Sequence, residues 1–185
     1  MTASVSKTCL VRFDNNRYSV AAHAIGRPVE IRAYAERVEL RQDGVVVGEH
    51  PRSFGRDQTI YDPWHYVPVL ARKPGALRNG APFKDWVLPA SLERIRRKLT
   101  TAQDGDRQMV SILAAVLSDG LPAVEAACSE AVREGVCSAD IVLNILARQR
   151  EPKAPVTILT TPQALKLHIE PVADCSRYDS LRRAI

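Results

Sequence analysis

The segment from residue 54 to residue 86 constrains the fold most strongly, because proline interrupts it repeatedly in the string FGRDQTIYDPWHYVPVLARKPGALRNGAPFKDW. The same segment contains both tryptophans of the chain and several Arg and Lys residues. Each proline fixes φ and removes a backbone donor, so a regular helix or strand is disfavoured here. We therefore predict an extended segment whose rings pack on other surfaces and whose guanidinium groups can hold phosphate.

The residues before this segment predict short β-strands. Apolar side chains alternate with polar ones through residues 28–34 and 37–41, and the inward positions are predicted to be Val29, Ile31, Ala33, Val38, Leu40, Val45 and Val47. Residues 9–13 and 18–20 are further short apolar runs, and Asp43-Gly44 is a strong hairpin signal. Short strands at this spacing indicate a small SH3-like β-barrel over residues 8–60.

The residues after it predict α-helices. Residues 91–99 and 106–117 have apolar side chains at helical spacing, Pro122 suits the first turn of a third helix, and Ser138 suits the N-cap of a fourth. The predicted fold class is therefore α+β. It comprises the barrel at 8–60, an extended strap at 61–88, a small helical bundle at 89–150, and a Pro-containing tail at 151–185 that we expect to be extended or disordered.

Composition narrows the class of protein. An apolar fraction of 45% with 25% charged residues is ordinary for a soluble globular chain. No apolar run approaches the ~18 residues that a membrane-spanning helix needs, so a cytoplasmic location is the expectation. The four cysteines lack the CxxC spacing of a zinc site, and we expect neither a metal nor another cofactor.

Charge is unevenly distributed along the chain. Residues 1–99 contain 17 Lys and Arg against 10 Asp and Glu, whereas residues 100–185 contain 9 against 11. A basic first half favours an acidic partner, and nucleic acid is the most plausible one.

No catalytic arrangement stands out in the sequence. The acids of the first half have no spacing typical of a metal-carboxylate site, and KPGALRNG lacks the Lys-Ser/Thr ending of a phosphate-binding loop. His65 is more simply a packed ring than a catalytic base. Two further alternatives stay open. Trp64 and Trp86 are packing anchors or base-stacking platforms, and the run Arg94, Arg96, Arg97, Lys98 is a solvated helix face or a phosphate contact.

An ordered series of motifs resembles the C-terminal part of IstA-type transposases of the insertion sequence 21 family, whose barrel is similar to the Mu transposase C-terminal domain. The motifs are FDNNRYSV (13–20), GRPVEIRAY (26–34), DGVVVGEHPRSFGRDQTIYDPWHY (43–66), RKPGALRNGAPFKDW (72–86), and DGDRQMVSILAAVLSDG and VLNILARQR in the helical part. Ala21 and Ala22 depart from the family pattern, in which a proline is usual. Met1 followed by TASVSK resembles an internal start in a longer reading frame.

The resemblance implies a non-catalytic fragment. The family's helix-turn-helix region and its core with a DDE carboxylate triad have no counterpart among these motifs, so no catalytic residue is carried over and we expect no enzymatic activity. The implied partners are transposon-end DNA, other transposase protomers and the AAA+ ATPase of the same element. The alternatives are an interaction module without DNA affinity and an inert remnant.

The resemblance and the charge pattern together give a set of candidate residues. The candidates for DNA contact are Arg12, Arg17, Tyr18, Arg27, Arg52, Arg56, Arg72, Lys73, Arg78, Arg94, Arg96, Arg97 and Lys98, and the expected structural anchors are Trp64, Tyr66 and Trp86.

Overall fold

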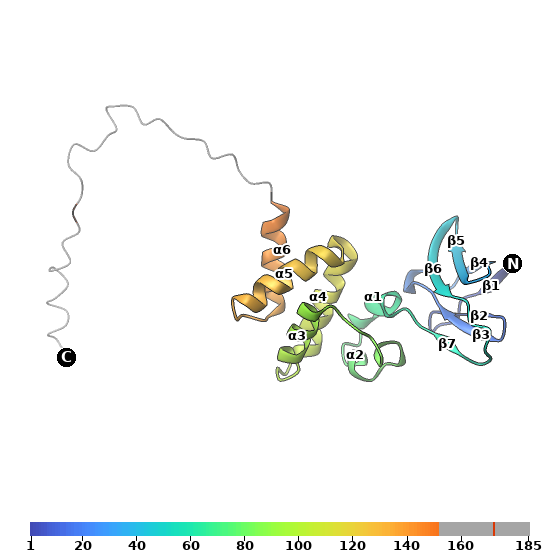
Figure 1. The fold of residues 1–185 in the computed structure, drawn as a ribbon, viewed down its shortest axis with the longest axis horizontal. Helices are drawn as coiled ribbons and strands as arrows, with labels where there is room; N and C mark the ends of the chain where they lie inside the picture. Colours follow the sequence, from blue (N-terminus) through green and yellow to red (C-terminus); the bar gives the residue numbers. More distant parts are fainter. Residues whose placement is uncertain (152–171, 173–185) are drawn as a thin grey trace, which may run out of the picture. The chain divides into compact units, whose positions relative to one another are not determined.

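The structure, a computed structural model, describes residues 1–151 and residue 172. It combines strands near the N-terminus with helices that follow, which confirms the predicted α+β class (Figure 1). The prediction for the tail lies almost wholly outside the described residues.

The strands form two sheets instead of one closed barrel in the described part of the chain. One sheet has the order β1-β4-β5-β6 and contains β1 (Thr2–Ser4), β4 (Pro28–Ala33), β5 (Arg37–Gln42) and β6 (Val45–Pro51), all antiparallel to their neighbours. The other has the order β2-β3-β7, in which β2 (Leu10–Phe13) is antiparallel and β7 (Thr59–Ile60) parallel to β3 (Asn16–Ser19). The described strands thus agree with the predicted small β-domain, but they form two sheets and no closed barrel.

Two hairpin turns follow from local sequence. Asp43 and Gly44 both have positive φ, at 51° and 81°, as a two-residue turn between twisted strands requires. Asp14 and Asn15 also have positive φ, at 49° and 59°, and they connect β2 to β3. Short polar side chains tolerate this backbone region better than others, which explains why DNN and DG occur where the chain reverses.

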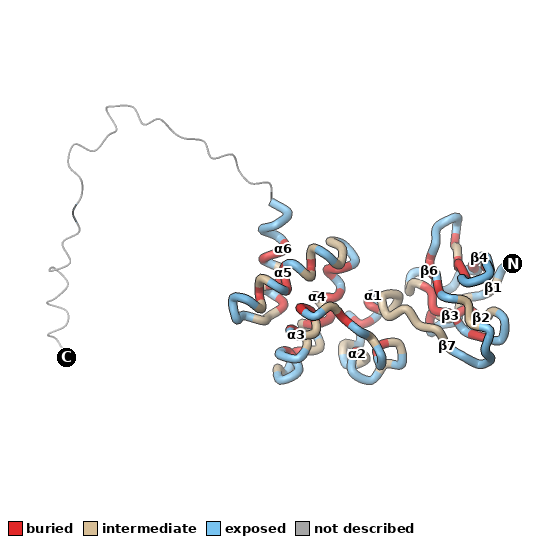
Figure 2. The backbone as a smooth tube through the Cα atoms, in the orientation of Figure 1, coloured by how far each residue is buried: buried red, intermediate tan, exposed pale blue. Residues whose placement is uncertain are grey.

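Burial follows the predicted alternation over most of the strands but not at two positions. Val29, Ile31, Val38, Leu40 and Val47 are buried as predicted, and Figure 2 shows buried stretches within the strands. The prediction was wrong for two further residues, because Ala33 is exposed and Val45 is 63% exposed. A register shift between Leu40 and Arg41 interrupts the alternation of the hairpin before it reaches Val45.

The strap is not uniformly extended, contrary to the prediction. It contains the short helical elements η2 (Pro63–Tyr66), α1 (Val67–Leu70), α2 (Ala76–Asn79) and η3 (Ala81–Phe83). Proline occupies the first or second position of η2, α1 and η3, where the missing N–H would have no helical partner in any case. The prolines therefore start short helices here, and they also keep them short.

The strap shares its core with the helices that follow. Those helices are α3 (Ala90–Leu99), α4 (Gly105–Asp119), α5 (Leu121–Arg133) and α6 (Ala139–Arg150). Val67, Leu70, Leu77 and Phe83 are buried in one cluster with residues of α3 to α6. The strands have a separate core around Val11, Tyr18, Val20 and Leu40.

Gly105, at the start of α4, gives a sharp test of the helical packing. A Cβ atom at this position would lie 1.8 Å from the backbone oxygen of Leu99, whereas a Cβ at Gly75 would meet nothing within 4 Å. We expect Gly105→Ala to lower the free energy of unfolding by about 1–3 kcal/mol, because backbone has to move to admit the methyl group. The matched control Gly75→Ala should leave it unchanged or raise it slightly. Denaturant unfolding measures both, and equal effects of the two substitutions would contradict this packing.

Candidate nucleic-acid interface

Asn16 is a buried side chain that holds the loop of residues 52–58 against the β2–β3 hairpin. Its Nδ2 donates to the carbonyl oxygens of Ser53 at 3.0 Å and Gly55 at 2.9 Å, and its Oδ1 accepts from the backbone N–H of Gln58 at 3.1 Å. Asn16 is 0% exposed, so these bonds replace water at every polar atom of the amide. The loop is therefore fixed by one residue of β3.

Arg12 and Arg17 lie directly opposite each other on β2 and β3. Residues opposite each other in an antiparallel pair point to the same face, and both of these are exposed. Within residues 1–151 neither makes an ion pair with a carboxylate, although other arginines of the strands do. Like charges in this position destabilise a sheet, so the pair forms a basic surface that an external anion would neutralise.

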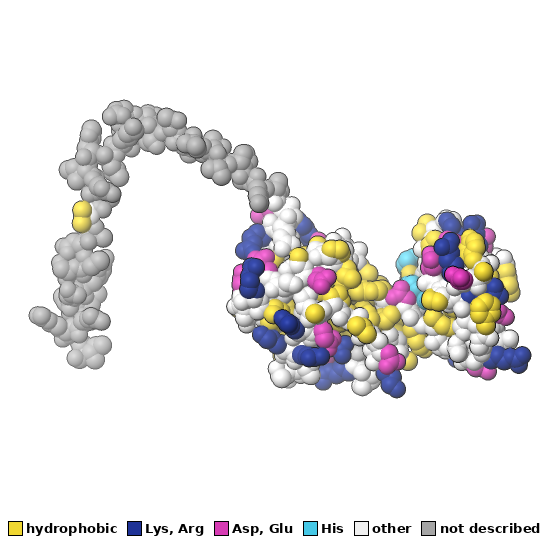
Figure 3. All heavy atoms as spheres, viewed as in Figure 1, with side chains coloured by type: hydrophobic (Ala, Val, Ile, Leu, Met, Phe, Trp, Pro, Cys, Tyr) yellow, Lys and Arg dark blue, Asp and Glu magenta, His cyan; other side chains and the backbone are white. Residues whose placement is uncertain are grey.

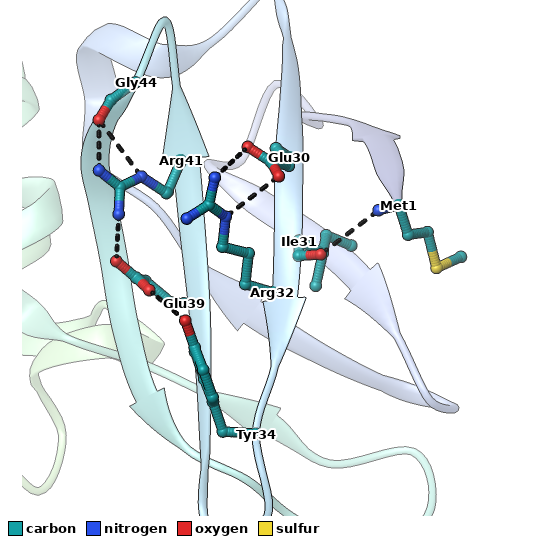
Figure 4. A network of polar contacts seen from close by, with 8 residues as sticks. All are labelled: Met1, Glu30, Ile31, Arg32, Tyr34, Glu39, Arg41 and Gly44. Atoms are coloured by element: carbon teal, nitrogen blue, oxygen red, sulfur yellow. Dashed lines mark hydrogen bonds and ion pairs between the residues drawn. The ribbon is translucent and has the colours of Figure 1, made fainter.

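The arginines of the larger sheet are in the opposite situation, as Figure 4 shows. Arg32 bonds both carboxylate oxygens of Glu30, at 3.1 and 3.3 Å. Arg41 bonds Glu39 at 2.9 Å and also the carbonyl oxygen of Gly44. The Arg32 guanidinium holds the pKa of Glu30 below its ordinary value, because it donates to the carboxylate. This face is internally neutralised.

Arg52 has internal partners as well, although it was predicted as a DNA contact. Its guanidinium donates to the carbonyl oxygen of Tyr34 at 3.0 Å and to Asp14 at 3.2 Å. It also lies 5.9 Å from the centre of the Phe13 ring and 5.0 Å from that of Phe54. Arg27 is similarly paired, with Asp43 at 2.6 Å. Both residues serve the fold in this structure.

The strap and α3 supply a second group of cations, and Figure 3 shows Lys and Arg side chains over strands and helices alike. Arg78 bonds Asp106 at 2.7 Å, and Arg96 and Arg97 lie near Glu93 at 3.6 and 3.4 Å. The exposed candidates that have no carboxylate partner among the described residues are Arg56, Arg72, Lys73, Arg94 and Lys98, in addition to Arg12 and Arg17.

Tyr18 is a correction to the predicted set. It is 0% exposed and packs in the strand core, where its hydroxyl accepts a hydrogen bond from the Ser53 N–H at 3.0 Å. Alternation in β3 places Tyr18 on the face opposite to Arg17, so an aromatic next to a basic residue does not share its surface.

The predicted anchors pack against the helical core. Trp64 and Trp86 are partly buried and meet edge to face at 4.9 Å between ring centres. The ring centres of Tyr66 and Phe83 lie 6.3 Å apart. The Tyr66 hydroxyl donates to the carbonyl oxygen of Thr8 at 3.0 Å. Burial raises the pKa of Tyr66 above its ordinary value. These rings connect the strap to the helical core and, through Thr8, to the residues that precede β2.

A polar cluster of Ser19, His50, Asp62 and His65 fixes the start of the strap on β3. The Ser19 hydroxyl accepts from the Asp62 N–H at 2.8 Å and lies 2.8 Å from His65 Nδ1, so its proton is available to that nitrogen. His50 Nε2 lies 2.6 Å from the Ser19 carbonyl oxygen and must donate, since a carbonyl only accepts. The triad-like set Ser19, His65 and Asp62 is structural, because Ser19 is 0% exposed.

Burial favours the neutral form of both histidines in this cluster. Burial lowers the pKa of His65 to about 4, with Asp62 opposing the shift and His50 and His23 adding to it. Burial likewise lowers the pKa of His50, against weaker opposing contributions from the Ser19 carbonyl, Asp62 and Glu49. In the unfolded chain both have the ordinary value near 6.5 and bind protons first.

Acid should therefore destabilise the protein through these histidines. Above pH 6.5 the two histidines are neutral in both the folded and the unfolded state, and their full contribution to the free energy of unfolding is present. This contribution is lost as the pH falls from 6.5 toward 4, because the unfolded state then binds more protons than the folded state. We expect His65→Asn, whose Oδ1 can accept from Ser19, to flatten the decline of the melting temperature between pH 7 and 4.5. The exposed Lys84→Gln, outside the cluster, is the control and should keep the wild-type slope. Parallel pH profiles for wild type and His65→Asn would contradict the assignment.

An apolar hollow of about 370 Å³ lies between the start of β2 and the strap. Cys9, Leu10, Tyr66, Leu70 and Phe83 line it, with Lys7 and Lys73 among its remaining residues. Burial raises the pKa of the Cys9 thiol, so this cysteine is not an activated nucleophile. The hollow offers packing surface without catalytic chemistry.

The described residues contain no group of three or more His, Cys, Asp or Glu side chains that could hold a metal ion. Among the same residues, no helix has the length and apolar character needed to cross a membrane.

Comparison with known proteins shows what the strand-containing part is similar to. Residues 1–62 match the family described as the Mu transposase C-terminal domain. Over nearly its whole length the chain is also similar to longer transposases. It is 44% identical over 190 residues to the transposase for insertion sequences IS1326/IS1353 of Pseudomonas aeruginosa and to that of Shigella flexneri, covering 99% of this chain and 36% of each relative. A transposase of Aminobacter aminovorans is 46% identical over 189 residues, or 98% of this chain and 37% of that protein.

These comparisons confirm the predicted resemblance to an insertion-sequence transposase. The chain spans little more than a third of the length of these relatives. No solved structure matches the chain.

Sequence reasoning missed several features of the strand-containing part. The strands β1 and β7, with three and two residues, are too short to show a period. Phe54 belongs to the segment 54–86, whose rings were predicted to pack on other surfaces, yet it is 74% exposed. No local signal marks this exposure, since Tyr18 also lies between a basic and a small residue and is 0% exposed.

Proposed function

We propose that this chain is a non-catalytic C-terminal part of an insertion-sequence transposase and that it binds transposon-end DNA. The observation that carries the proposal is the Arg12–Arg17 pair, two exposed like charges directly opposite each other with no described carboxylate as a partner. DNA phosphates would supply the missing counter-charge. The similarity to transposases over nearly the full chain supports this choice of anion.

We rank the candidate residues for this role by whether they have internal partners in the structure. Arg12, Arg17 and Arg56 form the proposed primary contacts, since the loop that bears Arg56 is bonded to the hairpin that bears the other two. The backbone N–H of Asp57 donates to the Asn15 carbonyl oxygen at 2.9 Å. Exposed cations without a described carboxylate partner give the secondary contacts, Arg72, Lys73, Arg94 and Lys98. Arg27, Arg52, Arg78, Arg96 and Arg97 have internal partners and rank lower.

The proposal includes no cutting or joining of DNA by this chain. Such chemistry requires carboxylates that converge on metal ions, and the described residues bring no such group together. In the proposed role the chain positions DNA for a catalytic core located elsewhere in the transposase. Other transposase protomers and the AAA+ ATPase of the element are the further partners we propose.

Salt dependence tests the DNA contact directly. Each phosphate contact adds about 0.9 to the slope of log affinity against log salt concentration, so Arg12→Ala/Arg17→Ala should reduce the slope by about 2. The fold should survive, because the substitutions remove a repulsion. Arg148→Ala is the control, since Arg148 is exposed and already paired with Glu130. Fluorescence anisotropy with duplex DNA measures the slopes. A slope unchanged by the double substitution would overturn this interface.

A second candidate function, an assembly module without DNA affinity, is favoured by the apolar hollow lined by Cys9, Leu10, Tyr66, Leu70 and Phe83. Its occupant would be an apolar surface of another transposase subunit, because the lining is mostly apolar apart from Lys7 and Lys73. Mixing the chain with an intact transposase distinguishes the two functions. Inhibition of transposition without binding of the chain alone to DNA would support assembly. If the chain alone shifts DNA at low salt, the first function stands.

A further inference from the structure

Phe54 is an aromatic ring presented to solvent by a fixed loop. It is 74% exposed, and single exposed apolar residues are ordinary in proteins. Two features distinguish it. The loop on both sides of the ring is bonded to Asn16, through the carbonyl oxygens of Ser53 and Gly55. The ring also has a specific neighbour on one side, the guanidinium of Arg52 at 5.0 Å.

Arg52 acts as a support for the ring. Its guanidinium is itself anchored by the Tyr34 carbonyl oxygen, by Asp14 and by the Phe13 ring. The Phe54 ring is thus held by a cation–π contact on one side, while most of its surface remains exposed. An aromatic ring held in this way can stack on a second flat ring without losing much conformational entropy.

Exposed basic side chains lie on the same loop and on the hairpin to which that loop is bonded. Arg56 follows Phe54 by two residues in the loop. Arg12, on β2, lines a hollow of about 310 Å³ together with Phe13, Asp14, Asn15 and Asp57. An exposed aromatic ring and exposed arginines on one bonded segment are the groups that single-stranded nucleic acid uses, because bases stack while phosphates pair with cations.

We propose that Phe54 is a stacking platform for an unpaired base of DNA. The inference rests on the proposed DNA-binding function and makes it specific for the structure of the DNA. Bases inside a duplex are already stacked on both faces, so the platform would accept a base from a single-stranded overhang or an opened end. Arg56 and Arg12 would contact the phosphates on either side of that base.

The test compares a blunt duplex with the same duplex carrying a short thymine overhang that contains 2-aminopurine. Stacking on an aromatic side chain contributes about 1–3 kcal/mol per base, so Phe54→Ala should weaken binding of the overhang DNA by about 5–150-fold. Binding of the blunt duplex should change less than about twofold. Phe54→Trp should retain the overhang preference, and 2-aminopurine fluorescence should be quenched by wild type and by the Trp variant. Val87→Ala is the matched control, because Val87 is 89% exposed and lies outside the loop.

The outcomes separate this inference from the function on which it rests. Equal affinity of wild type and Phe54→Ala for the overhang DNA would overturn the platform. If Arg12→Ala/Arg17→Ala still reduces the salt slope on blunt duplex, the DNA-binding function stands without it. A loss on blunt and overhang DNA alike would also overturn the platform, since it would show a general effect of the loop. Failure of the wild-type chain to bind either DNA would overturn both.

Discussion

Two buried polar residues of β3, Asn16 and Ser19, determine how the chain leaves the strand core. Both are 0% exposed. Asn16 bonds the loop of residues 52–58, and Ser19 bonds the first residues of the strap through Asp62 and His65. A buried polar group without a partner is costly, so each side chain stabilises one arrangement of the segment it holds. One short strand thereby positions both the proposed DNA-contacting loop and the connection to the helices.

The strand β6 lies close to the end of β3, and this contact also helps to fix the position of Ser19. A Cβ atom at Gly48 would lie 2.8 Å from the Ser19 carbonyl oxygen, which is also the acceptor for His50. The absence of a side chain at Gly48 allows this approach, and the Ala21 N–H bonds the Val47 carbonyl oxygen at 2.8 Å beside it. Contact between the sheets therefore depends on backbone as much as on the apolar core.

The sequence was sufficient to predict the elements whose signals are local. Alternation and the DG turn located β4 and β5, and Ser138 caps α6 as predicted by accepting from the Ile141 N–H. Prolines in residues 61–88 were read as breaking regular structure. The structure shows that they also start helical turns, because a proline at a helix N-terminus gives up no hydrogen bond.

Features that depend on contacts between distant residues could not be predicted. Composition identifies Arg52 and Arg12 as equal cations, but Arg52 has Asp14 and the Tyr34 carbonyl oxygen as partners, 38 and 18 residues away in the chain. Tyr18 similarly follows a basic residue, yet strand alternation turns it into the core. A candidate site defined by unpaired charge is therefore visible only after the internal ion pairs are known.

Amide hydrogen exchange of the free protein measures whether β3 fixes the segment that carries the basic and aromatic residues. The N–H groups of Gln58 and Asp62 donate to the side chains of Asn16 and Ser19, although Gln58 itself is an exposed residue. We expect both amides to be strongly protected, while the amide of Arg56 in the same loop, which has no described acceptor, exchanges rapidly. Exchange of the Gln58 and Asp62 amides as fast as that of Arg56 would contradict the account.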